Sequence, residues 1–317
     1  MGLALTVILF IAGLILIVKG GDSFVDSAVW IAEATGIPKF IIGATIVSLA
    51  TTLPEVIVSA LAAAAGKTDM AIGNAIGSVT ANTGLILGIS LFFMPAPMKR
   101  AAFGFKAILM IVATAALLLL SLPANGLSLK AGLVLWGILA VYIYESIHTA
   151  KQESAATDKN SINKKDALPN VLRFILGAAG IVVGARLLVN KGSDLAVFLG
   201  VPDSVVALTM MAVGTALPEL VTTVTAIRKK QSSLSVGNII GANIIDMTLI
   251  LPLCSAAYGG ILPMTRQTLV LDIPASLLIM SVAIIPALVH ERFRRWQGCA
   301  MLALYCAYVV ILVTGAI

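Results

Sequence analysis

The chain has 317 residues, of which 59% are hydrophobic and only 11% are charged. A soluble domain carries about 25% charged residues, so this composition excludes a water-soluble globular protein. The apolar runs exceed the ~20 residues that a helix needs to cross a bilayer, whereas a membrane β-barrel would show alternating segments of ~10 residues. The composition therefore predicts an all-α polytopic membrane protein.

Ten apolar segments follow one another, and we interpret each as one transmembrane helix. They fall near residues 3–34, 40–66, 70–94, 104–122, 128–148, 169–197, 203–227, 234–257, 267–288 and 294–316. The first and sixth are long and carry charges toward one end, which is typical of tilted or partly interfacial helices. The polar stretch at 149–168 predicts a flexible cytoplasmic linker. It divides the chain into a first five-helix repeat at 1–148 and a second at 169–317.

The formal net charge of +6 is distributed as in a membrane protein and not as in a nucleic-acid-binding protein. Most of the 21 Lys and Arg residues lie in alternate loops, and only Lys67, Lys130 and Arg266 lie in the remaining loops. Cytoplasmic loops are the ones that are rich in Lys and Arg. We therefore expect a multi-pass protein of the cell (inner) membrane, in contact with the lipid bilayer, with both termini outside.

The two halves repeat each other in register, with Glu55 and Glu219 standing 164 residues apart. TIVSLATTLPE at 45–55 matches TMMAVGTALPE at 209–219, and GNAIG at 73–77 matches GNIIG at 237–241. An odd number of segments separates the copies, so the second copy enters the membrane the opposite way up. Many secondary transporters bind their substrate near the bilayer midplane, where such inverted repeats meet.

Glu55 and Glu219 lie inside apolar segments, each directly after a proline. A charged side chain there costs roughly 2.5–3.5 kcal/mol. A protonated or hydrogen-bonded glutamate can simply fasten two helices. A symmetric pair, one from each half, favours a cation site at which both acids converge.

Pro54 and Pro218 support the same interpretation. A proline inside a helix removes a backbone hydrogen bond, so we expect each to break or kink its helix and to free carbonyl groups around Ala50 and Gly214. In lipid such carbonyls need a partner. That partner is either a neighbouring helix or water at a packing kink, or a bound cation.

Thr51 and Thr215 each precede a glutamate by four residues, which puts hydroxyl and carboxylate on one helix face. These hard oxygen donors suit Ca²⁺ or Na⁺. No Cys or His accompanies the motif, which disfavours zinc and copper.

The second repeated element adds Ser78 and Asn82, which are four residues apart, and Asp246, the counterpart of Asn82. Asp246 either fastens a helix through a hydrogen bond to a partner such as Asn82 or meets Asn82 near the symmetry axis. The glycines of this element let helices approach closely.

Other classes of membrane protein fit the sequence less well. No Walker-type GxxxxGK[ST] motif and no Ser/His/Asp constellation in a suitable context occurs in the sequence, so we expect neither a pump nor an enzyme, and no cofactor. A cation channel also needs oxygen-lined sites and is the alternative of another class. Inverted repeats with a proline-broken helix in each favour alternating access.

The repeated LPE and GN-I-G elements resemble the alpha repeats of the calcium/cation antiporter superfamily, in particular its prokaryotic sodium/calcium exchanger branch. The resemblance covers essentially the whole chain. It implies a secondary active antiporter that exchanges Ca²⁺ for Na⁺. It also implies a central Ca²⁺ site and flanking Na⁺ sites that share the two glutamates. The residues of this cluster are Glu55, Glu219, Thr51 and Thr215 for Ca²⁺, Thr52, Ser78 and carbonyls near Ser48 and Ala212 for Na⁺, and Asn82 and Asp246 in the middle.

The chain departs from this family at positions that bear on the coupling ion. Where the family usually has serine, this sequence has Thr52, Ala216 and Ala242. The two alanines lack a hydroxyl, which puts the number of Na⁺ sites in doubt and makes Ca²⁺/H⁺ exchange the alternative.

Further positions in the repeated elements bear on which branch of the superfamily this chain resembles. The proton-coupled branch typically has glutamate in place of Gly77 or Gly241, so glycine argues against that branch. Asp246 resembles the potassium-dependent members, which adds K⁺ as a candidate ion.

Overall fold

A computed structural model of the chain describes residues 3–95, 100–156, 164–199 and 216–314. These residues are helical almost throughout, with one short pair of strands. Nine of the described helices or continuous helix groups are long and apolar enough to cross a membrane. The chain is therefore an all-helical polytopic membrane protein, as its composition predicts.

The first half begins with the long helix α1 (Leu3–Thr35). The next two spans each contain a short π-helix, and a pair of long helices follows. Their elements are α2 (Lys39–Ile42), η1 (Gly43–Val47), α3 (Ser48–Ala64), α4 (Thr68–Ala81), η2 (Asn82–Leu87), α5 (Gly88–Phe93), α6 (Arg100–Ser121), η3 (Leu122–Ala124), β1 (Gly126–Leu127) and α7 (Leu129–Ala156).

The second half begins with the long helix α8 (Lys164–Phe198). Of the predicted segment 203–227, only the part from Leu217 onward forms a described helix. The elements that follow are α10 (Leu217–Arg228), α11 (Ser232–Ile245), η4 (Asp246–Ile250), α12 (Leu251–Tyr258), β2 (Leu262–Pro263), η5 (Thr268–Asp272), α13 (Ile273–His290) and α14 (Arg295–Thr314). Strand β2 pairs antiparallel with β1.

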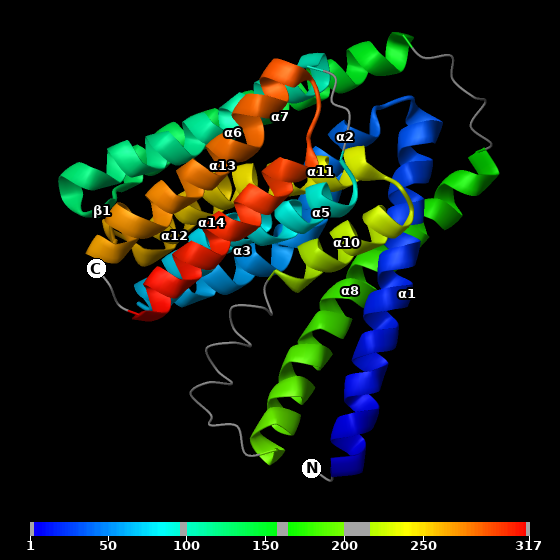
Figure 1. The fold of residues 1–317 in the computed structure, drawn as a ribbon, viewed down its shortest axis with the longest axis horizontal. Coiled ribbons are helices and arrows are strands. Elements are labelled where there is room, and N and C mark those ends of the chain that lie inside the picture. Colours follow the sequence, from blue (N-terminus) through cyan, green and yellow to red (C-terminus); the bar gives the residue numbers. More distant parts are fainter. Residues whose placement is uncertain (1–2, 96–99, 157–163, 200–215, 315–317) are drawn as a thin grey trace.

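The two long helices α1 and α8 lie side by side and lean away from the rest of the bundle (Figure 1). Glycines line their contact. A Cβ atom at Gly20 would lie 2.9 Å from the carbonyl oxygen of Gly177, and one at Gly184 would lie 2.8 Å from that of Gly13. Only glycine permits such an approach, so these four residues join α1 and α8 through their backbones.

Helix α11 lies in the centre of the remaining bundle, against α2, η1 and α3, and it is buried from Leu234 to its end. A methyl group at Gly237 would overlap the carbonyl oxygen of Phe40, and one at Gly241 would overlap that of Ala44. The close helix approach that the sequence predicts for the glycines of the repeat is therefore present at these two positions.

The predicted flexible linker at 149–168 is wrong in its extent. Helix α7 continues to Ala156 and α8 begins at Lys164, so only 157–163 lie outside the described residues. The stretch from 149 to 156, TAKQESAA, is rich in residues with high helix propensity, and extending an existing helix avoids the costly nucleation step. The Ser154 hydroxyl donates to the carbonyl of Thr35, at 2.6 Å, and so joins this extension to the end of α1.

Candidate cation site

Three acidic side chains gather inside the bundle. Glu55 on α3, Glu219 on α10 and Asp246 at the start of η4 are at most 1% exposed. Their charges interact, Glu55 with both other acids and Asp246 with Glu219. The acids that the sequence singles out therefore lie in the interior of the protein and do not face the lipid.

The oxygen atoms of these acids have few hydrogen-bond donors. No described residue donates a hydrogen bond of normal geometry to either oxygen of Glu55, to Oε2 of Glu219 or to either oxygen of Asp246. The same holds for Oδ1 of Asn82. A buried acceptor without a donor costs about 1–3 kcal/mol, and more when it is charged. This set of oxygens is therefore suited to a cation.

Hydroxyl groups from the first half face the acid of the second half. Thr52 Oγ1 donates to Glu219 Oε1 at 3.4 Å, and the Thr51 hydroxyl also lies beside Glu219. Thr51 Oγ1 lies 3.2 Å from the carbonyl oxygen of Ser48 and 3.2 Å from Oδ1 of Asn238. The site thus combines oxygens from α3, α10 and α11, which are far apart in the sequence.

The two counterpart residues Asn82 and Asp246 each begin a π-helix, η2 and η4. Such π-helical turns are frequent at functional sites. The amide of Asn82 donates to Ser78 Oγ at 3.3 Å, and Ser78 also lies next to Asp246. No described hydrogen bond joins Asn82 to Asp246, so of the partners that could fasten Asp246 to a neighbouring helix, Ser78 and not Asn82 lies beside it.

Of the break or kink predicted at Pro54, the break is wrong. Helix α3 runs from Ser48 to Ala64 with Pro54 inside it, and the irregular segment is the π-helix η1 just before. A proline removes only one N–H group, and tertiary contacts on both sides hold the helix together. At Pro218 the outcome differs, since α10 begins at Leu217 and Ala216 before it is not helical.

The remaining predicted positions differ in how much of them the structure describes. Thr215 and Ala212, and with them the carbonyl expected near Gly214, lie outside the described residues. The Ser48 carbonyl, which is the predicted Na⁺ ligand, lies 3.2 Å from Thr51 Oγ1, while the Ser48 hydroxyl donates to the carbonyl of Thr45 at 2.9 Å. Ala242 is fully buried and offers no side-chain oxygen.

Sequence reasoning missed three polar residues. Asn74 donates to Ser59 Oγ at 2.8 Å and to the backbone carbonyl of Glu55 at 3.5 Å. Asn238 accepts from Thr51. Both asparagines stand in the repeated GN-I-G element, where only the glycines were interpreted.

The third missed residue is Asp272, a further acid inside an apolar segment. It is 9% exposed and accepts a hydrogen bond from the Tyr308 hydroxyl at 3.1 Å. Its position in the segment 267–288 was visible in the sequence. It has no counterpart acid at the repeat offset, because Ile108 stands there.

In the described part of the chain, carboxylates alone do not supply enough ligands to hold a metal ion. No three His, Cys, Asp or Glu residues in it lie close enough together to hold a metal ion. Any ion near Glu55 and Glu219 must therefore also bind hydroxyl, amide or carbonyl oxygens. Such mixed oxygen sets are the ones that Ca²⁺ takes, with six to eight ligands at about 2.3–2.6 Å.

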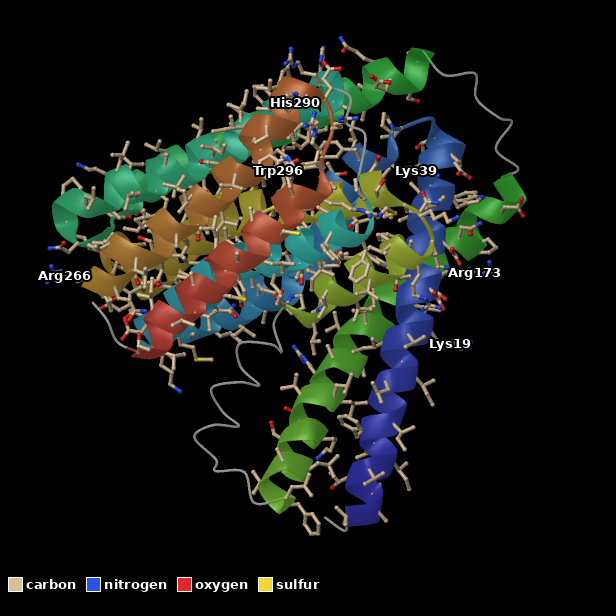
Figure 2. The ribbon with its side chains drawn as sticks, viewed as in Figure 1. Lys19, Lys39, Arg173, Arg266, His290 and Trp296 are labelled. Atoms are coloured by element: carbon tan, nitrogen blue, oxygen red, sulfur yellow. The ribbon has the colours of Figure 1, made fainter. Side chains whose placement is uncertain are left out.

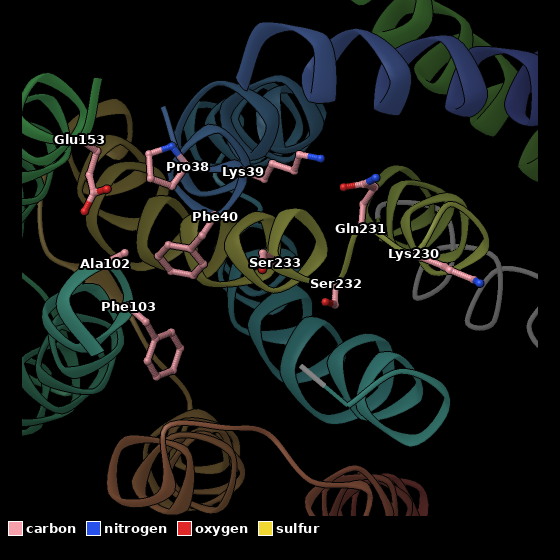
Figure 3. Close-up of a pocket in the computed structure, with 10 residues that line it drawn as sticks. All are labelled: Pro38, Lys39, Phe40, Ala102, Phe103, Glu153, Lys230, Gln231, Ser232 and Ser233. Atoms are coloured by element: carbon pink, nitrogen blue, oxygen red, sulfur yellow. The ribbon is translucent and has the colours of Figure 1, made fainter. Parts of the chain in front are cut away.

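A cavity of about 420 Å³ opens at the beginning of α11 (Figure 3). Charged residues, polar residues and aromatic rings line it together, namely Pro38, Lys39, Phe40, Ala102, Phe103, Glu153, Lys230, Gln231, Ser232 and Ser233. None of the residues that form the acidic cluster lines this cavity, so it is a separate feature.

Comparison with known proteins identifies the family of the chain. The family described as "Sodium/calcium exchanger protein" matches residues 5–147 and 170–314. An uncharacterized membrane protein of Methanocaldococcus jannaschii is 32% identical over 313 residues, covering 96% of this chain and 97% of that protein. The sodium/calcium exchanger MaX1 of Methanosarcina acetivorans is 29% identical over 345 residues, with coverages of 96% and 97%.

Solved structures give the same result. A structure of the sodium-calcium exchanger NCX_Mj, soaked with 10 mM Na⁺ and zero Ca²⁺, superposes with a TM-score of 0.86 at 30% sequence identity. The match covers 98% of this chain and 99% of that chain. This chain belongs to the sodium/calcium exchanger protein family.

Proposed function

We propose that this protein is a secondary active antiporter that exchanges Ca²⁺ for Na⁺ across the cell membrane. The observation that carries the proposal is the set of buried oxygens on Glu55, Glu219 (Oε2), Asp246 and Asn82 to which no described residue donates a hydrogen bond of normal geometry. Cations are the natural partners of such oxygens in a protein interior. The family of the chain, and the printed names of its relatives, support Na⁺ and Ca²⁺ as the transported ions.

The proposed ligands follow the cluster. Ca²⁺ binds between the carboxylates of Glu55 and Glu219, with the hydroxyls of Thr51 and Thr215. Na⁺ ions share the glutamates and use further oxygens at the edge of the cluster. These come from the side chains of Thr52 and Ser78 and the carbonyls near Ser48 and Ala212, with Asn82 and Asp246 in the middle.

Electrostatics explains why such a site exchanges ions and does not leak. An empty site holds uncompensated carboxylates, and closing it off from water removes their hydration at a cost of several kcal/mol per ion. A bound Ca²⁺ or several Na⁺ neutralise the charge and remove that cost. The loaded protein therefore changes its access more readily than the empty one, which couples the two ion fluxes.

The proposed architecture is ten transmembrane helices in two inverted five-helix repeats. Nine described spans and the separate helix α10 support this number, and the equivalent starts of η2 and η4 support the repeat. Lys39 and Arg173 lie away from Arg266, across the bundle (Figure 2). This separation supports the predicted orientation with both termini outside, and we propose the inner membrane as the location of the protein.

The test is uptake of Ca²⁺ into proteoliposomes that contain the purified protein. An outward Na⁺ gradient should drive uptake, and an imposed pH gradient or external K⁺ should change it little. Uptake driven by the pH gradient and indifferent to Na⁺ would favour Ca²⁺/H⁺ exchange, the alternative that Ala242 and Ala216 suggest. Flux in one direction without any counter-ion would indicate a channel.

A further inference from the structure

Asn238 lies beside the proposed cation ligands without being one of them. It is fully buried on α11, and Gly237 next to it brings the α11 backbone against Phe40. Its Oδ1 atom lies 3.2 Å from Thr51 Oγ1, and no described residue accepts a hydrogen bond from its Nδ2 group. The side chain therefore has one polar contact among the described residues, and that contact is to Thr51.

The Thr51 hydroxyl has one proton and two acceptors at equal distance. The carbonyl oxygen of Ser48 and Oδ1 of Asn238 both lie 3.2 Å from Thr51 Oγ1. A hydroxyl donates only one hydrogen bond while its oxygen keeps two lone pairs. The proton can therefore point to Ser48 or to Asn238, but not to both.

The two proton positions differ in what they leave for a cation. A proton on the Ser48 side occupies that carbonyl and puts positive charge between two oxygens that are expected to bind Na⁺ or Ca²⁺. A proton on the Asn238 side leaves the Ser48 carbonyl and the lone pairs of Thr51 free. Glu219 also lies near this hydroxyl, but a proton directed to it would engage an oxygen that the cation needs.

We propose that Asn238 is a positioning residue of the cation site, which accepts the Thr51 proton when an ion binds. The proposal rests on the proposed function, because it takes Thr51 and the Ser48 carbonyl as ligands. An uncharged amide suits this role, since it accepts a proton without adding a further buried carboxylate to the three already there. The side chain thus acts on ion affinity through Thr51.

The test compares Asn238→Leu with Asn243→Leu. Asn243 is a matched control on the same helix, because it is also fully buried and also contacts a threonine, with Nδ2 2.7 Å from Thr83 Oγ1. We expect Asn238→Leu to raise the KM for Ca²⁺ about tenfold, the loss of one hydrogen bond near an ion, with kcat changed less than twofold. Asn243→Leu should change KM less than twofold.

A double-mutant cycle with Thr51→Val separates positioning from general packing. If Asn238 acts through the Thr51 hydroxyl, Asn238→Leu adds little to KM once that hydroxyl is gone, whereas a packing defect adds its full effect in both backgrounds. An unchanged KM in Asn238→Leu, or full additivity, would overturn the proposal. If the leucine variant does not fold, Asn238→Ala enters the same cycle, and Ca²⁺ binding to the purified variant replaces KM. Failure of the exchange proposal itself is distinct, because it would show as an absence of Na⁺-driven Ca²⁺ uptake by the unaltered protein.

Discussion

The tripeptide Leu-Pro-Glu occurs in both halves of the molecule but occupies different places in its two helices. In α3 the proline lies inside a helix that runs unbroken from Ser48 to Ala64. In α10 it lies in the first turn, after Ala216, whose backbone dihedrals are φ −83° and ψ 0°. Proline is compatible with both places, because the first turn needs no N–H donor and the interior loses only one.

The difference between α3 and α10 teaches that an identical local sequence does not fix local structure. Around Pro54, Asn74 donates to the carbonyl of Glu55, and α11 packs along α3 and η1. These contacts support a continuous helix. What the two copies share is the burial of the glutamate after each proline, at 0% and 1% exposure. Both acids are therefore buried although the backbone around the two prolines differs.

The largest effect is expected from the acids, and it tests whether the two halves contribute equally. Glu55→Gln and Glu219→Gln each remove one negative charge while keeping the shape of the side chain. We expect either change to lower Na⁺-driven Ca²⁺ uptake in proteoliposomes at least 100-fold, because one carboxylate cannot compensate a divalent ion in lipid. Asp272→Asn is the control, and we expect it to take up Ca²⁺ as fast as the unaltered protein. That result would show that the large effect does not follow from the loss of any buried acid. Normal exchange by either glutamine variant would contradict the ligand assignment.

A smaller effect should distinguish the two prolines. Pro54→Ala restores an N–H donor to the Ala50 carbonyl in mid-helix, which raises helix propensity by about 3 kcal/mol and gives that carbonyl the helical partner that proline denies it. We expect a higher melting temperature and a KM for Ca²⁺ raised about tenfold. Pro218→Ala acts in a first turn, where an N–H has no helical partner. The KM for Ca²⁺ should therefore stay within about twofold of its original value, and the melting temperature within about 2 °C. Equal effects of the two changes would erase the contrast between α3 and α10.

The smallest effect concerns Ser78 and Ala242, which occupy equivalent positions in the two halves. Ser78→Ala removes a hydroxyl next to Asp246 and Asn82, and Ala242→Ser adds one on α11. We expect the Na⁺ concentration for half-maximal exchange to rise about threefold in the first variant and to fall about threefold in the second, since one neutral ligand is worth about 0.5–1.5 kcal/mol. Ca²⁺ binding without Na⁺ serves as the control. Shifts of the same sign in both variants would show that the positions are not functionally equivalent.

Much of the fold could be predicted because hydropathy is a property of each segment alone. The predicted segment 70–94 and the observed run from Thr68 to Phe93 differ by two residues at most at either end. The polar run after Thr149 could not be interpreted in the same way, because polar residues are compatible with both coil and helix. Its attachment through Ser154 to Thr35 joins residues 119 positions apart, which no local pattern contains.

Less of the candidate site could be predicted. Glu55 and Glu219 stood out because a charge in an apolar segment has no local explanation. Asn238 did not, because an asparagine beside glycines is also typical of close helix packing. Its contact with Thr51 depends on how closely α11 approaches η1 and α3, and this follows from the backbone contacts at Gly237 and Gly241.

The sequence by itself determined the class of the protein and identified Glu55, Glu219 and Asp246 as acids inside apolar segments, because the cost of placing a charge in lipid belongs to the residue and its immediate segment. Only the tertiary structure decided which oxygens of the site have no hydrogen-bond donor among the described residues. It also decided which residues of one half contact residues of the other half. The Thr52–Glu219 contact spans 167 residues and the Thr51–Asn238 contact spans 187. Contacts of this range arise only when packed helices bring the two halves together, so hydrogen-bond partners in the site follow from the fold and not from the motif.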